Sequence, residues 1–305
     1  MMNKGMELTI DYKLIDGRDF DLSFNFNTSR NRNIMLRLPE NYSLEIGDML
    51  ANGNYKISIE PGKALGGFFG YRYLGVYSTD EDAIVYGEDG QPVYGFNTNP
   101  LRMIHGGSSG YVFEGGDARY DDINFDGKID ELDLVYLGDL NPDFMGGFGP
   151  RISYKNLIFN TFFYYKIGQK IINQTRMDTE KMYNHDNQSK ATNWRWRRPG
   201  DDTNVPRALY ERGFNWMGSD RFVEDGSYVR LKSASVTYKF SDKFCDRLKI
   251  GDLKVYATGY NLFTWTGYSG QDPDVASPSK PTELPKDYSR TPPSFRVTLG
   301  ANITF

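Results

Sequence analysis

The last eleven residues of the chain alternate strictly between apolar and polar side chains. Every second residue from Phe295 to Phe305 is apolar, and the residues between them are polar or glycine. Because side chains of a strand point to opposite faces in turn, this stretch predicts a strand with one apolar and one polar face. An edge strand of an ordinary two-layer sheet shows the same pattern, so this stretch alone does not identify the fold and the rest of the chain is needed.

The same alternation recurs in pairs of segments joined by short turns. Residues 8–14 and 20–26 flank the turn-forming run Asp16-Gly17-Arg18-Asp19, which is typical of a hairpin. A second pair flanks Lys155-Asn156, and a third, at 226–240 and 253–265, is joined by the segment that holds Cys245. Segments 68–78 and 133–138 are further candidates, so we expect about eight to ten strands.

Long polar connections separate these pairs, at residues 29–65, 78–120, 168–225 and 266–293. Such lengths are uncommon inside compact domains. A membrane barrel, in contrast, has short periplasmic turns at one rim and long extracellular loops at the other. The chain therefore predicts an all-β, antiparallel transmembrane β-barrel structure with long extracellular loops. Residues expected to face the lumen are Asp21, Ser23, Asn25, Arg296 and Asn302.

Composition excludes several classes of protein. The 305 residues carry a net charge of −4, which gives no support to nucleic-acid binding. Cys245 is the single cysteine, so a disulfide framework and a multi-thiolate metal site are excluded. No apolar run approaches the roughly 18 residues of a spanning helix. The first residues lack the apolar segment of a secretion signal, so an exported protein is expected to have sequence upstream of Met1.

One loop has the residue spacing of an EF-hand calcium site. In DINFDGKIDELD the expected ligands, at loop positions 1, 3, 5, 7, 9 and 12, are Asp122, Asn124, Asp126, Lys128 through its carbonyl oxygen, Asp130 and Asp133. Gly127 permits the sharp turn of such a loop. Asp133 is shorter than the usual glutamate, so modest affinity for Ca²⁺ and a structural role are expected. The alternative is an acidic surface turn without an ion.

Loop 168–225 combines aromatic residues with arginines, as sites for sugars or peptides do. Aromatic faces stack on sugar rings, and guanidinium groups hold hydroxyls or carboxylates. The candidate substrate-binding residues are Trp194, Trp196, Arg198, Tyr210 and Trp216. An aromatic girdle at the membrane interface and packing against a partner protein are the alternatives.

A hydrolase motif is present only formally. Residues 106–110 match G-x-S-x-G, with Ser108 in the nucleophile position and His105 beside it. That motif requires a strand, a sharp turn and a helix, followed later by an acid and a histidine. No helix is expected after Gly110, and His185 lies in a polar loop. We therefore assign no catalytic residue and expect that the protein is not an enzyme.

Several blocks together resemble the SusC/RagA-type TonB-dependent outer-membrane transporters of the Bacteroidetes. The blocks are GGFFGYRYLGVYS, GDARYDDINFDGKIDELDLVYLGDLNPDF, FVEDGSYVRLKSASVTYKF, VYATGYNLFTWTGYSGQDPDV and FRVTLGANITF. They occur in the order found in the C-terminal third of that family and span nearly the whole chain. The resemblance implies that residues 1–305 are the C-terminal portion of a large antiparallel transmembrane β-barrel, without the N-terminal plug and signal peptide.

The resemblance also implies a function and partners. Such a transporter imports nutrients through the outer membrane, with a SusD-like surface lipoprotein as a lid and TonB acting through the absent N-terminal region. Oligosaccharides are the commonest cargo that the family implies, and peptides come second. Outer-membrane lipid would surround the strands, and nucleic acid is not an expected partner.

A different class of protein also fits part of the pattern. The strands could form a self-contained, calcium-stabilised β-domain that acts in binding or adhesion at the cell surface. Such a domain would bury its apolar rows against a second layer and would be soluble and monomeric alone.

Overall fold

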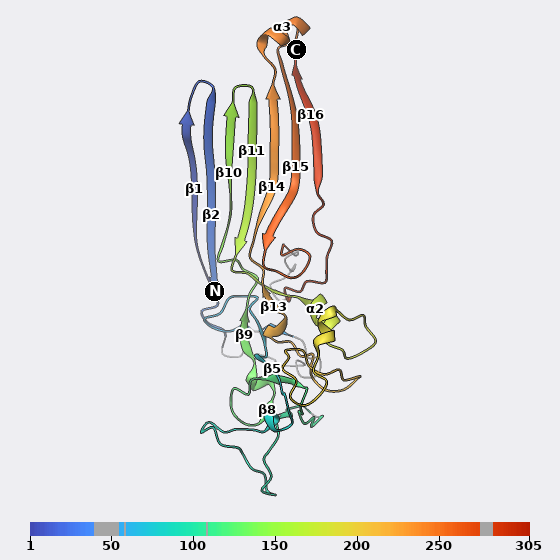
Figure 1. Cartoon of the computed structure of the whole chain (residues 1–305). Coiled ribbons are helices and arrows are strands. Elements are labelled where there is room, and N and C mark those ends of the chain that lie inside the picture. The colour runs from blue at the N-terminus through green and yellow to red at the C-terminus, as the bar shows by residue number, and fades with distance from the viewer. Residues whose placement is uncertain (40–54, 58, 108, 275–282) are drawn as a thin grey trace.

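Seven long antiparallel strands dominate the computed structural model, which describes residues 1–39, 55–57, 59–107, 109–274 and 283–305. They form one sheet in the order β1-β2-β10-β11-β14-β15-β16. Their bounds are β1 (Met2–Asp16), β2 (Phe20–Ile34), β10 (Phe144–Tyr154), β11 (Leu157–Ile167), β14 (Tyr228–Lys239), β15 (Asp252–Thr266) and β16 (Arg296–Thr304). Figure 1 shows them side by side, with β1 at one edge and β16 at the other. The expected all-β class is confirmed.

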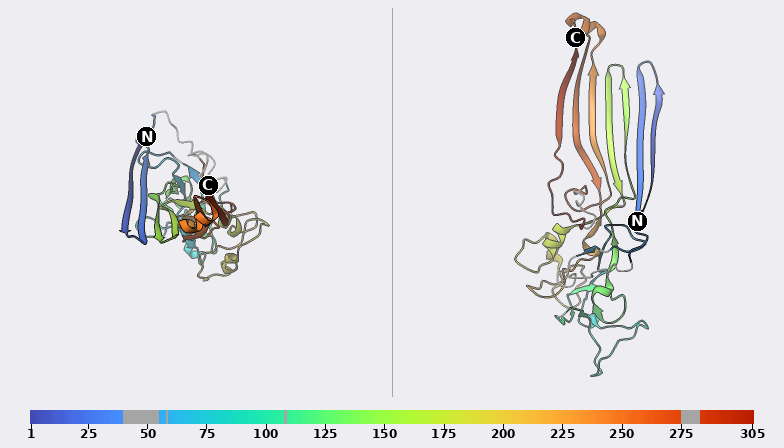
Figure 2. Two further views of the ribbon diagram at one scale, coloured as in Figure 1. Left: turned by 90° about the horizontal axis from the view of Figure 1, so that it is seen from above. Right: turned by 180° about the vertical axis from the view of Figure 1, so that it is seen from behind.

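Short turns join the strands at one end of the sheet, and long connections join them at the other. The turn at Gly17 links β1 to β2, Lys155 and Asn156 link β10 to β11, and helix α3 (Asp242–Leu248) lies between β14 and β15. We call this the turn end. The opposite, loop end carries connections 35–143, 168–227 and 267–295, whose described residues we call the loop assembly. Figures 1 and 2 show the loop assembly gathered beyond the loop end of the sheet.

The loop assembly contains small sheets and short helices of its own. Its strands are β3 (Lys56–Ile57), β4 (Phe68–Gly70), β5 (Tyr73–Val76), β6 (Ile104–His105), β7 (Ala118–Tyr120), β8 (Lys128–Ile129), β9 (Val135–Gly138), β12 (Lys170–Ile172) and β13 (Val223–Asp225). Its helices are α2 (Gln174–Glu180) and the 3₁₀ turns η1 (Glu81–Ala83), η2 (Glu131–Asp133), η3 (Lys190–Trp194) and η4 (Asp220–Phe222). Throughout the described ranges, no helix has the length and apolar character needed to cross a membrane.

The hydrophobic core lies in the loop assembly and not against the long sheet. One cluster of buried residues comprises Tyr71, Tyr77, Ala83, Val85, Met103, Phe113, Ala118, Tyr120, Ile129 and Met217. A second comprises Tyr55, Phe68, Ile172, Met177 and Phe222. On the sheet, by contrast, Leu299 is 78% exposed and Phe263 is 64% exposed. The loop assembly is therefore folded like a water-soluble domain, whereas the sheet leaves large apolar side chains uncovered.

Two segments that were candidates for the long sheet belong to the loop assembly instead. Segment 68–78 forms β4 and β5, and segment 133–138 contains β9. Consecutive residues Phe68, Phe69, Gly70 and Tyr71 are all buried, so this segment has no exposed apolar face. Aromatic and β-branched runs favour a strand in either setting, and for this reason both segments form strands without adding to the seven of the long sheet.

The first long connection also begins later than the sequence suggested. The polar run from Ser29 to Asn33 was expected to open a loop, but β2 continues through it to Ile34. Each residue of the run pairs with β1, from Glu7↔Ser29 to Asn3↔Asn33. Cross-strand pairing thus overrides the low apolar content of this stretch.

Substitutions of buried and exposed phenylalanines should separate the two environments. Phe113→Ala removes a fully buried ring from the loop assembly, so the free energy of unfolding in detergent micelles should fall by about 3–5 kcal/mol. Phe263→Ala on the exposed sheet face should cost far less, because detergent fills the space. Denaturant titration followed by near-UV circular dichroism measures both, and equal costs would contradict this division.

Candidate functional site

Two neighbouring rows of residues on opposite faces of the long sheet differ in chemistry. Residues directly opposite in register share a face. One row that crosses all seven strands is entirely apolar: Ile15, Leu22, Ile152, Phe159, Val236, Ala257 and Leu299. The neighbouring row, on the opposite face, is entirely polar: Lys13, Ser23, Arg151, Asn160, Ser235, Thr258 and Thr298. The sheet is therefore a wall with an apolar face and a polar face.

Aromatic residues reinforce the apolar face. Phe148 and Phe163 stack with ring centroids 4.8 Å apart, and Phe24 lies 6.4 Å from Phe148. Phe163 in turn lies 6.3 Å from Trp265. These contacts run from strand to strand along the sheet and leave the outer surfaces of the rings uncovered.

The polar face carries the residues that were expected to face a lumen. Ser23 belongs to the polar row, and Asp21 and Asn25 share its face because they lie two residues away on the same strand. Arg296 and Asn302 alternate with apolar residues on β16 and lie on the face of Thr298. A hollow on this face is lined by Asp11, Lys13, Asp21, Ser23, Arg151 and Asn160, among others.

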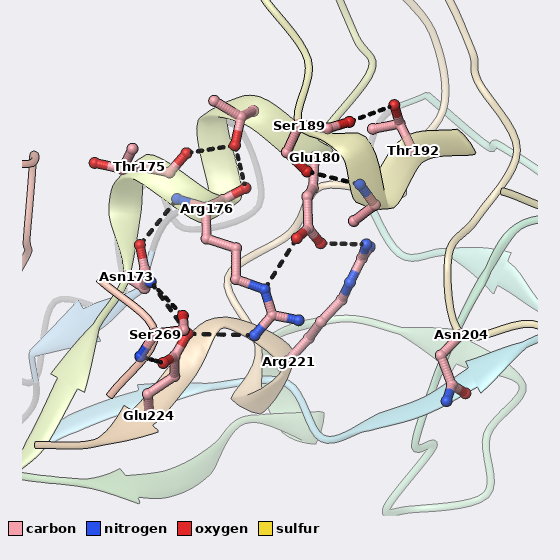
Figure 3. Close-up of polar contacts among 12 residues, drawn as sticks. Asn173, Thr175, Arg176, Glu180, Ser189, Thr192, Asn204, Arg221, Glu224 and Ser269 are labelled. Atoms are coloured by element: carbon pink, nitrogen blue, oxygen red, sulfur yellow. Dashed lines mark hydrogen bonds and ion pairs between the residues drawn. The ribbon is translucent and has the colours of Figure 1, made fainter. Parts of the chain in front are cut away.

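The loop assembly contains a pair of adjoining hollows that share Arg176 and Glu180 of α2 (Figure 3). The first hollow is lined by Asn173, Thr175, Arg176, Thr179, Glu180, Ser189, Glu224, Ser269, Gly270, Gln271 and Ser289. The second is lined by Tyr73, Leu74, Gly75, Arg176, Glu180, Ala191, Asn204, Val205 and Arg221. We call them the paired hollows. Every residue of the first is polar or glycine, which distinguishes it from the apolar clusters beside it.

Two glutamates and two arginines form a charge-balanced network between the paired hollows. Arg176 Nε donates to Glu180 Oε1 at 3.0 Å, and Arg176 Nη1 donates to Glu224 Oε1 at 3.3 Å. Arg221 Nη2 donates to Glu180 Oε2 at 3.0 Å, and these two side chains are only 5% and 6% exposed. Figure 3 shows Arg176 and Glu180 of α2 directed toward Arg221 and Glu224. Four opposite charges thus meet within one small volume.

Glu224 also ties three separate segments together. It accepts hydrogen bonds from the Asn173 side chain at 3.1 Å and from the Ser269 N–H and hydroxyl at 2.8 and 2.7 Å. Burial raises the pKa of this carboxyl, but the Ser269, Asn173 and Arg176 donors outweigh it, so that the pKa lies below its ordinary value. Glu224 is therefore ionised at neutral pH.

The five aromatic and arginine residues expected to bind substrate do not gather at one place. Trp194 is 79% exposed, whereas Trp196 packs on Gly116 and donates from Nε1 to the Ser78 carbonyl oxygen at 3.0 Å. Arg198 pairs with Asp201, and Tyr210 contacts His185. Trp216 packs against the second core cluster. None of these five residues lines the paired hollows.

The expected calcium loop folds as a closed turn. Gly127 has a φ of 79°, and its N–H donates to Asp122 Oδ2 at 2.8 Å. The Ile123 and Asp130 N–H groups both donate to Asp133 at 2.8 Å. The Asp133 side chain is fully buried, and burial raises its pKa to about 6. Within the described ranges, no group of three or more His, Cys, Asp or Glu side chains is arranged to hold a metal ion.

The remaining members of the loop face the backbone. Asp126 Oδ1 accepts from the Lys128 N–H at 2.9 Å, Asn124 Oδ1 accepts from the Asp126 N–H at 3.2 Å, and Asp130 Oδ1 accepts from the Leu132 N–H at 2.9 Å. The loop backbone therefore has the shape that an oxygen-ligand site needs, while its side-chain oxygens bind N–H groups of the same loop.

The formal hydrolase motif gains no catalytic geometry. Ser108 lies outside the described residues. His105 is buried, stacks on Phe214 with ring centroids 3.6 Å apart, and accepts the Gly107 N–H at Nδ1. His185 lies beside Tyr210. His105 is thus packed in the interior, and exposed His185 hydrogen-bonds the Tyr210 hydroxyl at 3.0 Å.

Comparison with known proteins gives one consistent class. No family model matches the chain. TonB-dependent receptor P3 of Formosa agariphila is 30% identical over 99% of this chain and 28% of its own length. TonB-dependent receptor P39 of the same organism is 28% identical, with 30% of its length covered, and TonB-dependent receptor SusC of Bacteroides thetaiotaomicron is 24% identical over 90% of this chain.

Solved structures agree with the sequence relatives. The RagAB peptide importer in its closed-closed state matches 99% of this chain with a TM-score of 0.69 at 20% identity, over 29% of its own chain. Its open-open state matches with a TM-score of 0.67. The fold of the long sheet is thus that of a part of the wall of an antiparallel β-barrel. The chain is similar to the TonB-dependent receptors of the SusC/RagA type that its sequence blocks resemble, and it spans less than a third of the relatives that it matches.

The hydrogen bonds of Glu224 in the paired hollows predict that the stability of the loop around Ser269 depends on pH. Since the pKa of Glu224 is lowered by folding, its stabilising contribution is present at neutral pH and disappears as pH falls below its ordinary value of 4.5. Glu224→Gln should lower protection of the Ser269 amide from hydrogen exchange by about 1–3 kcal/mol at pH 7.

That difference should shrink at pH 3, after correction for intrinsic exchange rates. Glu211→Gln, an exposed residue of the same connection, serves as the control and should leave the Ser269 amide unchanged. A loss of protection that is equal at both pH values would rule out a role for the ionised carboxylate.

Proposed function

We propose that the chain is the C-terminal barrel segment of a TonB-dependent importer in the outer membrane. The long sheet supplies part of the barrel wall, and the loop assembly supplies part of its extracellular surface. The relatives named above are receptors and importers, in line with a protein that is not an enzyme. Nutrient import through this wall is the activity that we assign to the assembled transporter.

The uncovered apolar face carries this proposal. A row of seven apolar residues crosses the sheet without a second layer of described residues over it, and Leu299 in that row is 78% exposed. In water such a face would be strongly unfavourable, whereas hydrocarbon is a suitable solvent for it. A self-contained soluble adhesion module would instead bury these rows, so the importer is favoured over that alternative.

The two ends of the sheet supply an orientation. Barrels of this kind keep short turns on the periplasmic side and long loops outside. We therefore place the turn end in the periplasm and the loop assembly at the cell surface. A SusD-like surface lipoprotein is the proposed lid over the loop assembly, and TonB would act on a part of the transporter other than residues 1–305.

The paired hollows favour a neutral, hydroxyl-rich cargo. The first hollow offers hydroxyls, amides and charged groups, and no apolar residue lines it to receive a peptide side chain. Both arginines are already paired with glutamates, so a carboxylate cargo finds no surplus positive charge there. We accordingly assign oligosaccharides as cargo, with peptides, which RagAB is described as importing, as the second candidate.

A structural calcium ion is a second proposal. The DINFDGKIDELD loop supplies oxygen donors at the required spacing, and Gly127 already has the left-handed conformation. Ca²⁺ would draw Asp122, Asn124, Asp126 and Asp130 from their backbone partners toward one centre, with the Lys128 carbonyl and Asp133 completing it. Its role would be to brace the turn against Val85 of the first core cluster, which lies beside Gly127.

Uptake experiments test the import proposal. Deletion of the coding sequence should abolish uptake of a fluorescent neutral glucan oligosaccharide by the native cell, and an uncoupler that collapses the proton gradient should do the same. Asn204→Ala with Gln271→Ala, which removes two side-chain amides from the paired hollows, should lower uptake about fivefold or more.

Asn187→Ala with Gln188→Ala removes the same side-chain types from an exposed stretch of the same connection and should leave uptake unchanged. Amounts of protein in the outer membrane must match between variants. Normal oligosaccharide uptake in the deletion strain, or a selective loss of peptide uptake, would refute the assignment.

Calcium binding is tested by thermal unfolding with and without Ca²⁺. At a concentration of about 100 times Kd, the ion should stabilise the protein by about 2.7 kcal/mol. Asp122→Asn should abolish this increment. Asp121 pairs with Arg72 outside the loop, so the control Asp121→Asn should preserve the increment. An unchanged unfolding curve for the wild type in millimolar Ca²⁺ would contradict the site.

A further inference from the structure

The apolar face of β1 and β2 turns basic as it approaches the loop end. Opposite pairs Tyr12↔Phe24 and Ile10↔Phe26 are apolar, the mixed pair Leu8↔Thr28 comes next, and the pairs Met6↔Arg30 and Lys4↔Arg32 follow on the same face. Every second residue keeps to one face, so Lys4, Arg30 and Arg32 lie one pair beyond the apolar rows. They are on the side of the wall opposite to its polar face.

A second observation places Arg30 on that face independently. Its guanidinium lies over the Phe144 ring, 5.2 Å from the centroid. Phe144 lies four residues before Phe148 on β10, so the two side chains share a face. Phe148 is directly opposite Phe26 of β2. Arg30 therefore follows on from the aromatic rows of the apolar face.

The loop assembly adds a fourth cation to the same place. The Met35 N–H donates to the Lys63 carbonyl oxygen at 2.9 Å, and the Gly62 N–H donates to the Met35 carbonyl oxygen at 2.7 Å. These bonds hold Lys63 beside the end of β2, where its ammonium lies 4.7 Å from the centre of the Tyr136 ring. We call Lys4, Arg30, Arg32 and Lys63 the basic cluster.

A hollow lies between the end of β2 and segment 139–143. It is lined by Arg30, Asn31, Arg32, Asn33, Ile34, Gly62, Lys63, Ala64, Tyr136, Asp139, Asn141, Pro142 and Asp143. Asp139 already accepts from the Tyr136 hydroxyl at 2.6 Å and from the Asn141 N–H at 2.8 Å. Across the described ranges, no ion pair engages the basic cluster. Three of its cations, Arg30, Arg32 and Lys63, line the hollow together with two carboxylates.

The height of the basic cluster matches the surface of a bilayer. Ten residues separate Phe20, at the turn end of the apolar face, from Arg30. At about 3.3 Å per residue, this is roughly 33 Å along the strand. A tilt of about 40° reduces it to about 25 Å, the height of the apolar band of an outer-membrane barrel. Arg30 thus marks the upper edge of that band, where lipid headgroups lie.

We propose that the basic cluster is a binding site for the phosphate-bearing headgroup of an anionic lipid in the outer leaflet. Guanidinium groups bind phosphate oxygens in bidentate fashion, and ammonium groups add point charge. The acyl chains would lie on Phe24, Phe26 and Phe148 directly beneath the headgroup, an arrangement that free phosphate cannot use. This inference rests on the proposed location in the outer membrane.

Lipid selectivity in native mass spectrometry tests the site. The wild-type transporter that contains residues 1–305, reconstituted in vesicles with equal amounts of phosphatidylglycerol and phosphatidylcholine and released into detergent, should retain phosphatidylglycerol preferentially. In the variant Arg30→Gln/Arg32→Gln/Lys63→Gln, the ratio of retained phosphatidylglycerol to phosphatidylcholine should be at least tenfold lower, since each cation near a membrane surface adds to the affinity for anionic lipid. The control Lys190→Gln/Arg197→Gln/Arg212→Gln removes three cations of the loop assembly and should keep it.

Each result has a distinct meaning. Equal preference in wild type and variant, or an equal loss in the control, overturns the site. Displacement of the lipid by inorganic phosphate at equal concentration overturns the assignment to a lipid. A wild-type transporter containing residues 1–305 that enters neither pure phosphatidylcholine nor mixed vesicles contradicts the outer-membrane location itself, whereas normal insertion of both proteins without selectivity contradicts only the basic cluster.

Discussion

The long sheet must satisfy two solvents at once, and this requirement explains most of the molecule. Its ladder hydrogen bonds pair the backbone groups within the sheet, which hydrocarbon demands of any spanning structure. Its side chains then divide by face, so that the row of Leu299 meets an apolar phase and the row of Thr298 meets water. Strands β1 and β16 have one neighbour each in the described sheet, and their outer edges call for further strands.

The loop assembly is stabilised by a buried core and hydrogen bonds, as water-soluble domains are. It buries aromatic residues such as Phe113 and Tyr120 and pins the surrounding loops with charged hydrogen bonds. Arg207 Nε donates to the fully buried Asp117 at 2.8 Å, and Asn215 accepts the Ala118 N–H at 2.7 Å. These bonds join the segment around residue 117 to that around residue 210. The loop assembly, with its own packed core, is therefore built on a wall that has no core.

The sequence predicted the wall because alternation is a local property. Rows such as Phe159 and Asn160 can be assigned to opposite faces without knowledge of any partner strand. The sequence misplaced segments 68–78 and 133–138, since aromatic runs favour strands whether they face lipid or a protein core. It also ended β2 too early, because Arg30 and Arg32 have the composition of a loop and only their pairing with β1 shows the strand.

The candidate sites were less accessible to prediction. The calcium spacing and the Trp194 to Trp216 stretch could be found because their residues are neighbours in the chain. Arg176 and Glu224 lie 48 positions apart, and Glu224 and Ser269 lie 45 apart. No local pattern signals such a meeting, which depends on how two connections, 168–227 and 267–295, fold over the loop end. The same holds for Lys63, which reaches β2 only through backbone bonds to Met35.

The balance of charge in the paired hollows has a kinetic consequence. Arg176, Arg221, Glu180 and Glu224 compensate one another within a few ångströms, so their field falls off quickly with distance. A neutral ligand would feel no steering toward this place, and its encounter rate should be nearly independent of ionic strength. Retention would then depend on how slowly the ligand leaves, which is the step that a closing partner protein can control.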